Sequence, residues 1–173
     1  MLQLADRLLY QAKAEGRNTY RFYTRALTER AHQRLTLESQ LRQAINNEEF
    51  ILHYQPLVDT LSGRPLGVEA LVRWNSPQGM ISPAEFIPLA EDTGLIVPIG
   101  TWVLREACRQ AQALRSQGFA LETLAVNLSP RQFRQVDLLQ QVRAALHDSG
   151  LPAACLELEI TEGALMDDVA QTQ

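Results

Sequence analysis

The chain has 173 residues, of which 46% are hydrophobic and 21% are charged, and its formal net charge is -4. This composition is ordinary for a soluble globular domain, and the absence of a basic tract argues against duplex nucleic acid as a partner. No apolar run reaches the roughly 18 residues of a membrane span, and Asp6 and Arg7 interrupt the start too early for a signal peptide.

The first 47 residues carry two patterns, and the first of them, at residues 4–23, is too small to build a core. Residues 4–14 have the pattern of a helix that ends at Gly16, and residues 18–23 that of a short strand. Residues 24–47 carry apolar side chains at helical spacing, with Glu and Arg between them. We expect a docked or simple linker helix there, and a coiled coil with a partner helix is the alternative.

From Phe50 the pattern changes to strands and helices. Residues 50–59 and 66–74 predict two strands that form a hairpin around the turn at Ser62-Gly63. A loop with Pro77, Gly79 and Pro83 follows. Ser82 is placed to cap a helix whose first position is Pro83 and whose third is Glu85, and this helix is expected to run to about Asp92 and stop at Gly94.

The remaining elements alternate between helix and strand. A helix is predicted at 99–117, a strand at 124–129, a helix at 136–149 and a strand at 156–161. This order is typical of a parallel α/β fold. Cys108 and Cys155 are isolated in apolar surroundings, which predicts two reduced thiols in the core of a cytosolic protein.

The strand at 66–74 contains both an acid and an arginine. Because side chains alternate along a strand, Glu69, Leu71 and Arg73 share one face, and an apolar set on the other face is ready for helices. Little water is expected at the charged face. A carboxylate there needs either a structural ion pair with Arg73 or a bound ligand, and the strand alone leaves both open.

The other strands carry polar groups at comparable positions. Gln55, Asn127 and Glu159 each lie in a predicted strand, and with Glu69 they give four strands that each carry a polar group near the C-terminal end. In parallel α/β folds the site lies at that end, so the four groups are expected to converge at one mouth of the sheet. Two carboxylates and an amide oxygen suit Mg²⁺ or Mn²⁺, and a nearby guanidinium suits phosphate. The alternative is that these groups satisfy only the backbone or one another.

Residues 50–173 resemble an EAL domain, the family of cyclic di-GMP phosphodiesterases. The resemblance rests on several motifs in order, namely Tyr54-Gln55-Pro56, the segment from Gly67 to Trp74, Pro83 to Pro88, Ala90-Glu91 with Gly94-Leu95-Ile96, Ile99 to Leu104, Val126 to Ser129, and Leu156 to Glu162. Residues 1–23 resemble the last helix and strand of a GGDEF (diguanylate cyclase) domain. The expected organisation is a GGDEF remnant at 1–23, a linker helix at 24–47 and the N-terminal half of an EAL domain at 48–173.

The resemblance implies a partial TIM-like (β/α)₈ barrel, about its first four strands, with the first strand antiparallel to the rest. It implies hydrolysis of cyclic di-GMP to pGpG by a two-metal mechanism that uses Mg²⁺ or Mn²⁺. By motif, the metal ligands would be Glu69, Asn127 and Glu159. Gln55, Leu71 and Arg73 would contact substrate, with Arg73 on a phosphate, and Glu162 would hold a loop beside the metals.

The chain also departs from the family pattern. It stops at Gln173, and the family's paired aspartates, catalytic lysine and late glutamate are absent, as is the GGDEF signature loop. We therefore expect the chain alone to be inactive, although its parent resembles a phosphodiesterase. The alternative is a degenerate EAL module that binds cyclic di-GMP or a protein without catalysis. The linker helix and the open edge of a half barrel are both candidate surfaces for a homodimer.

Overall fold

The computed structural model of the chain describes residues 25–160. The helix expected at 4–14, the strand expected at 18–23 and Glu162 lie outside these residues. The chain divides into two compact units, residues 1–37 and residues 38–173, and the β-sheet belongs to the second. Within the described part of the chain, no helix combines the length and the apolar character needed to cross a membrane.

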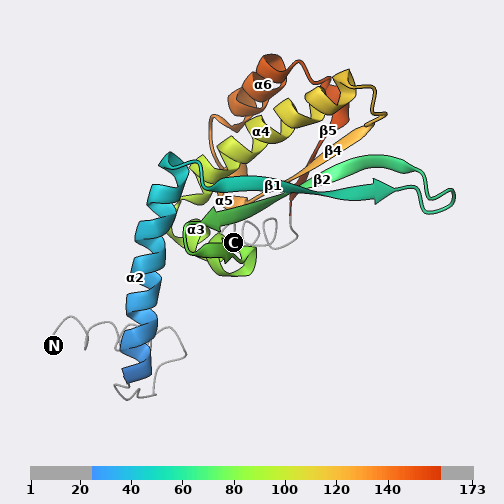
Figure 1. Cartoon of the computed structure of the whole chain (residues 1–173). Helices are drawn as coiled ribbons and strands as arrows, with labels where there is room; N and C mark the ends of the chain where they lie inside the picture. Colours follow the sequence, from blue (N-terminus) through green and yellow to red (C-terminus); the bar gives the residue numbers. More distant parts are fainter. Residues whose placement is uncertain (1–24, 161–173) are drawn as a thin grey trace, which may run out of the picture. The chain divides into compact units, whose positions relative to one another are not determined.

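The described elements alternate as the sequence predicts. They are α2 (Arg25–Asn46), β1 (Phe50–Val58), β2 (Pro65–Ser76), β3 (Gly79–Ile81), α3 (Pro83–Thr93), α4 (Ile96–Ser116), β4 (Thr123–Leu128), α5 (Pro130–Phe133), α6 (Leu138–Ser149), a 3₁₀ turn (Ala153–Cys155) and β5 (Leu156–Ile160). Figure 1 shows these elements coloured along the sequence, from blue for α2 to red for β5.

The strands form one sheet in the order β1-β2-β4-β5, with β3 paired to β2. β1 and β2 are antiparallel, which confirms the predicted hairpin, and β2, β4 and β5 are parallel to one another. A first strand that runs against parallel neighbours is the arrangement expected of a partial barrel of the EAL type. Cys108 and Cys155 are both free and buried, which confirms that they are core residues.

Helices α4 and α6 cover the same side of the sheet (Figure 1). α4 buries a stripe of apolar residues at helical spacing, among them Ile99, Val103 and Ala107, and Leu124 and Val126 of β4 are also buried. Close to the start of β1, the ring of Phe50 lies 6.1 Å from Trp74, 5.9 Å from Phe86 and 6.1 Å from Trp102. Trp74 and Phe86 are 0% exposed, so these aromatic rings anchor the core.

The other face of the sheet is open in the described residues. Ile51, His53 and Gln55 of β1 are exposed on this face, and so are Asn127 of β4 and Glu159 of β5. The expectation of little water was made for the side chains of Glu69, Leu71 and Arg73, which are half-buried, so it is met only in part for residues 25–160. The reason is that strand alternation defines two faces, while only packing decides whether a second layer covers each of them.

Three local predictions differ from the structure. α4 begins at Ile96, three residues earlier than expected, because Pro98 lies in the first helical turn, where the missing N–H has no intrahelical acceptor. The loop after β2 contains the short strand β3, which pairs with the end of β2. Ser82 occupies the N-cap position of α3, but its side chain makes no capping hydrogen bond. Its carbonyl oxygen instead accepts from Glu85 N and Phe86 N.

The segment between β4 and α6 is also more regular than predicted. The four-residue helix α5 follows β4 directly, and α6 begins at Leu138 rather than at 136. A capping box starts α5, in which the side chain of Ser129 accepts from Gln132 N and the side chain of Gln132 accepts from Ser129 N. The sequence Ser129-Pro130-Arg131-Gln132 carries the signal for this turn.

Candidate functional site

Glu69 of β2 and Asn127 of β4 meet on the open face of the sheet. The side-chain Nδ2 of Asn127 donates a hydrogen bond of 2.6 Å to Oε1 of Glu69. The two residues come from parallel neighbouring strands, in which Glu69 lies opposite Ala125, and Asn127 is two residues further along β4. Register therefore places both side chains on the same face, and the hydrogen bond joins them across 58 residues of sequence.

The strand register adds the other two predicted groups to this face. Gln55 of β1 lies opposite Glu69, and Glu159 of β5 lies opposite Asn127. The four residues thus belong to four adjacent strands. Directly opposite residues in a sheet have Cβ atoms roughly 5 Å apart, close enough for their side chains to share a ligand.

The donor atoms at this place fit a hard divalent cation. Oε2 of Glu69, Oδ1 of Asn127 and both carboxylate oxygens of Glu159 accept no hydrogen bond from residues 25–160. Carboxylate and amide oxygens are the ligands that Mg²⁺ and Mn²⁺ prefer. No three His, Cys, Asp or Glu side chains within the described chain form a group that could hold a metal ion, so a site at this place would combine carboxylates with the amide oxygen of Asn127.

Leu71 and Arg73 continue the same face toward the C-terminal end of β2. Leu71 lies opposite His53, and Arg73 lies opposite Ile51. Nη1 of Arg73 donates to the carbonyl oxygen of Val72 at 2.9 Å. In residues 25–160 Arg73 forms no ion pair with Glu69, so the purely structural Glu–Arg pair left open by the sequence is not formed.

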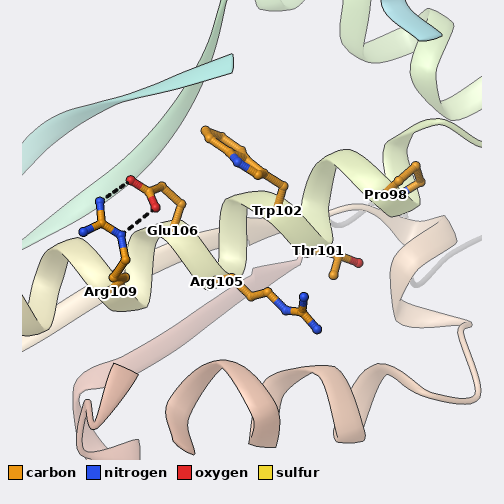
Figure 2. A pocket seen from close by; sticks show the side chains of 6 residues that line it. All are labelled: Pro98, Thr101, Trp102, Arg105, Glu106 and Arg109. Atoms are coloured by element: carbon orange, nitrogen blue, oxygen red, sulfur yellow. Dashed lines mark hydrogen bonds and ion pairs between the residues drawn. The ribbon is translucent and has the colours of Figure 1, made fainter. Parts of the chain in front are cut away.

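A groove of about 460 Å³ lies elsewhere, along the outer surface of α4. Trp102 and Glu106 project on one side of this helix, and Thr101 and Arg105 project on the other (Figure 2). Because α4 packs on the opposite face of the sheet from Glu69, this groove is separate from the predicted site. Among the residues that line the groove, Glu106 is the single carboxylate, so the groove offers no set of oxygen donors comparable with that of the open face.

Two of the residues that line the groove form an ion pair with each other. Arg109 donates to both carboxylate oxygens of Glu106, at 2.8 Å from Nε and 2.7 Å from Nη2. These hydrogen bonds lower the pKa of Glu106 and raise the pKa of Arg109. Gln110 also donates to Glu106. The charges of Glu106 and Arg109 therefore satisfy one another locally, which is the expected behaviour of a solvated helix surface.

Two groups near α4 have raised pKa values because they are buried. Burial, and next to it the charge of Glu106, raises the pKa of Tyr54 to about 12. Burial raises the pKa of the Cys108 thiol to about 11. Both groups are neutral at physiological pH, and a thiol with a raised pKa is a poor nucleophile. Cys108 is therefore a core residue.

Sequence reasoning overlooked one buried polar side chain close to the site. Gln132 is 6% exposed and lies five residues after Asn127. Its carboxamide is held by the capping box at the start of α5. The Ser-Pro-x-Gln pattern after a strand was the available signal, because a glutamine at the third helical position completes such a box.

Comparison with known proteins identifies relatives across the whole second unit. The profile of the EAL domain family matches residues 38–173. The chain is 47% identical over 165 residues to the bifunctional diguanylate cyclase/cyclic di-GMP phosphodiesterase MucR of Pseudomonas aeruginosa, covering 95% of this chain and 24% of that protein. It is 43% identical over 173 residues to the cyclic di-GMP phosphodiesterase NbdA of the same species, covering 99% of this chain and 22% of that protein.

A solved structure supports the same relationship. The structure described as the MucR phosphodiesterase in complex with c-di-GMP superposes with a TM-score of 0.73 at 48% identity, and the match covers 79% of this chain and 56% of that one. The chain thus spans less than a quarter of the length of these two curated relatives and about half of that phosphodiesterase structure.

Proposed function

The chain belongs to the EAL domain family, and from this premise we propose that it is part of a metal-dependent phosphodiesterase that hydrolyses cyclic di-GMP to pGpG. The single observation that carries the proposal is the contact between Asn127 Nδ2 and Glu69 Oε1, at 2.6 Å on the open face. It unites two of the three expected metal ligands, and the third, Glu159, lies opposite Asn127. The matched relatives whose names include this activity support the proposal.

In this proposal, Glu69, Asn127 and Glu159 hold Mg²⁺ or Mn²⁺ through their oxygen atoms. The chemistry that such ions would supply is a water nucleophile of lowered pKa and stabilisation of the oxygen that departs in an in-line displacement. Asn127 has a second task, because its N–H fixes one oxygen of Glu69 and leaves the other free for a cation.

Three further residues bind the substrate in this proposal. Arg73 would hold a phosphate of cyclic di-GMP, because a planar guanidinium can donate to two phosphate oxygens at once. Gln55 and Leu71 would line the groove along β1 and β2, where both lie on the open face. Glu162 would hold a loop beside the metals, as the family resemblance implies.

The 173-residue chain is nevertheless expected to show negligible turnover by itself. In residues 25–160 the proposed ligands Asn127 and Glu159 are exposed to water, and no three His, Cys, Asp or Glu side chains form a group that could hold a metal ion. Two-metal hydrolysis requires ligands for a second ion and a site that excludes water. We therefore assign the activity to the longer protein and the binding of one ion to this chain.

The binding of Mn²⁺ to the intact chain tests the proposal. Titration calorimetry should detect one site that is weakened by about tenfold or more in Glu69→Gln and in Glu159→Gln, because each loses an anionic ligand. Glu157→Gln is the matched control, since Glu157 lies on the same face of β5, opposite Ala125. Mn²⁺ binding that is equal in all four proteins would remove these residues from the metal site.

A hydrolysis assay tests the expected inactivity. Incubation of the chain with cyclic di-GMP and Mn²⁺, followed by chromatography, should release no more pGpG than Glu69→Ala does. Metal-dependent release of pGpG that is lost in Glu69→Ala would show that the isolated chain is catalytic.

A non-catalytic module that binds cyclic di-GMP or a protein is the second candidate. The observation that favours it is the small number of anionic groups at the site within the described residues. Under this alternative, cyclic di-GMP binds in the presence of EDTA, and Arg73→Ala abolishes binding while Glu69→Ala leaves it unchanged. Binding that requires both Mn²⁺ and Glu69 favours the enzyme.

The remaining domain assignments are part of the same proposal. We place a GGDEF remnant at 1–23, a linker helix at 24–47 and EAL residues at 48–173, in a protein that works in the cytoplasm on a cytoplasmic nucleotide. The linker helix and the outer edges of the sheet, β1 and β5 in the described residues, are candidate surfaces for a homodimer.

A further inference from the structure

The segment that follows Asn127 is docked onto the junction of α3 and α4. β4 ends at Leu128, and α5 begins two residues later, beside the start of α4 (Figure 1). Nη1 of Arg131 donates to the carbonyl oxygen of Glu91 at 2.7 Å, which attaches α5 to the end of α3. The next side chain, that of Gln132, points into the core and is 6% exposed.

Gln132 holds the backbone immediately after the strand. Its Oε1 accepts a hydrogen bond of 3.2 Å from Ser129 N, and its own backbone N–H donates to Ser129 Oγ at 3.2 Å. Ser129 is two residues after Asn127. The side chain of Gln132 thus fixes the point at which the chain leaves β4.

Gly100 of α4 supplies the space for this side chain. A Cβ atom at position 100 would collide with Nε2, Cδ and Oε1 of Gln132. The carboxamide of Gln132 therefore lies directly on the surface of α4, in the place that any other residue at position 100 would fill. Gln132 connects the end of β4 rigidly to the helix that covers the sheet.

We propose that Gln132, seated on Gly100, is a positioning residue that sets the orientation of the Asn127 side chain toward Glu69. A hydrogen bond of 2.6 Å across two strands tolerates little displacement of either backbone. Asn127 is the next-to-last residue of β4, so its backbone is held on one side by the sheet and on the other by the turn that Gln132 fixes. Ligand groups need such support to within about 0.5 Å.

The metal-binding part of this inference rests on the proposed function, but the positioning itself does not. The first measurement is therefore the side-chain amide signals of Asn127 in the ¹H–¹⁵N spectrum of the metal-free 173-residue chain. These signals are assigned by their loss in Asn127→Asp. The second measurement is the dissociation constant for Mn²⁺, which is compared with that of Glu69→Gln.

The variants separate positioning from general stability. Gln132→Ala removes the acceptor for Ser129 N, and we expect it to shift or broaden the Asn127 side-chain signals and to weaken Mn²⁺ binding by about tenfold. Gln132→Glu keeps the acceptor, because glutamate is equally suited to the third position of a capping box, and should restore both properties. Gln135→Ala is the matched control, since that amide bonds only to Arg131 O among the described residues.

A double variant covers the case in which Gln132→Ala does not fold. In Gly100→Ala/Gln132→Ala, the new methyl group fills part of the space that the carboxamide leaves, yet the bond to Ser129 N is still absent. The Asn127 signals should remain displaced in this protein. Asn127 signals identical to wild type in either folded variant would overturn the proposal. If Mn²⁺ fails to bind the wild-type chain, the proposed function fails, and the amide signals still decide the role of Gln132.

Discussion

Polar side chains on the two faces of the sheet differ in whether they have a hydrogen-bond partner. On the open face, Asn127 donates a hydrogen bond to Glu69, so these two polar side chains are each other's partners. On the covered face, the hydroxyl oxygen of Tyr54 is buried and has no hydrogen-bond partner in residues 25–160. A buried polar atom without a partner costs free energy, so this hydroxyl is expected to destabilise the fold.

Replacing Tyr54 by phenylalanine should therefore increase stability. Tyr54→Phe keeps the ring that packs in the core and removes only the unsatisfied hydroxyl. We expect the free energy of unfolding at pH 7 to rise by roughly 1 kcal/mol. Urea denaturation followed by circular dichroism measures it, and a loss of stability would show that the hydroxyl has a partner in solution.

The same substitution should change the response to alkaline pH. The pKa of Tyr54 is raised from 10.0 to about 12 in the folded chain, mainly by burial. Between these values the unfolded chain loses the phenolic proton and the folded chain keeps it, so the wild-type fold loses stability, relative to its value below pH 10, as the pH rises toward 12. The stability advantage of Tyr54→Phe over wild type should thus grow from pH 10 to pH 11.

At the level of strands and helices, β2 is the central element. It pairs antiparallel with β1 and β3 and parallel with β4. The parallel pairing starts at Gly67, opposite Thr123, where the two backbones approach closely. A Cβ atom at position 67 would collide with the carbonyl oxygen of Thr123. The glycine is therefore required by the spacing of the strands.

Gly67→Ala tests the importance of this close approach. Because the obstacle is a backbone atom, the strands must separate, and we expect a loss of about 3 kcal/mol in the free energy of unfolding. Chemical denaturation measures the loss. Val58→Ala, at an exposed position of β1, should change stability by less than about 0.5 kcal/mol and serves as control. Equal stability of Gly67→Ala and wild type would contradict the strand spacing.

The molecule as a whole divides at residue 37. Residues 38–173 form one compact unit, and the EAL family profile matches the same residues. Leu41 and Ala44, in the part of α2 that belongs to this unit, are 0% exposed. The second unit is therefore expected to fold without residues 1–37 but to need the last turns of α2.

Two deletions test this division. Removal of residues 1–37 should lower the midpoint of thermal unfolding by less than about 4 °C, the effect of roughly 1 kcal/mol in a domain of this size. Removal of residues 1–47 also deletes Leu41 and Ala44 and should cost considerably more, because a buried surface is exposed. Calorimetry compares the three chains. Equal midpoints for both deletions would show that α2 does not contribute to the core.

Much of the fold could be predicted because it follows from local patterns. The alternation in β1, β2, β4 and β5 and the helical period of α4 identified these elements, and Gly94 and Gly150 marked the ends of α3 and α6. The elements that the sequence did not predict were short. β3 and α5 have three and four residues, too few to show a period, and they depend on pairing with β2 and on the Ser129–Gln132 box.

The candidate site, like the fold, could be predicted only in part from the sequence. Residue types and alternation alone indicated that Glu69 and Arg73 share a face and that Gln55, Asn127 and Glu159 offer oxygen donors for a hard cation, because these properties depend on neighbours in the chain. Strand register, by contrast, is set by packing between segments far apart in sequence. The three-dimensional fold was thus needed to join Asn127 to Glu69, to leave their face of the sheet open in the described residues and to place Gln132 against Gly100.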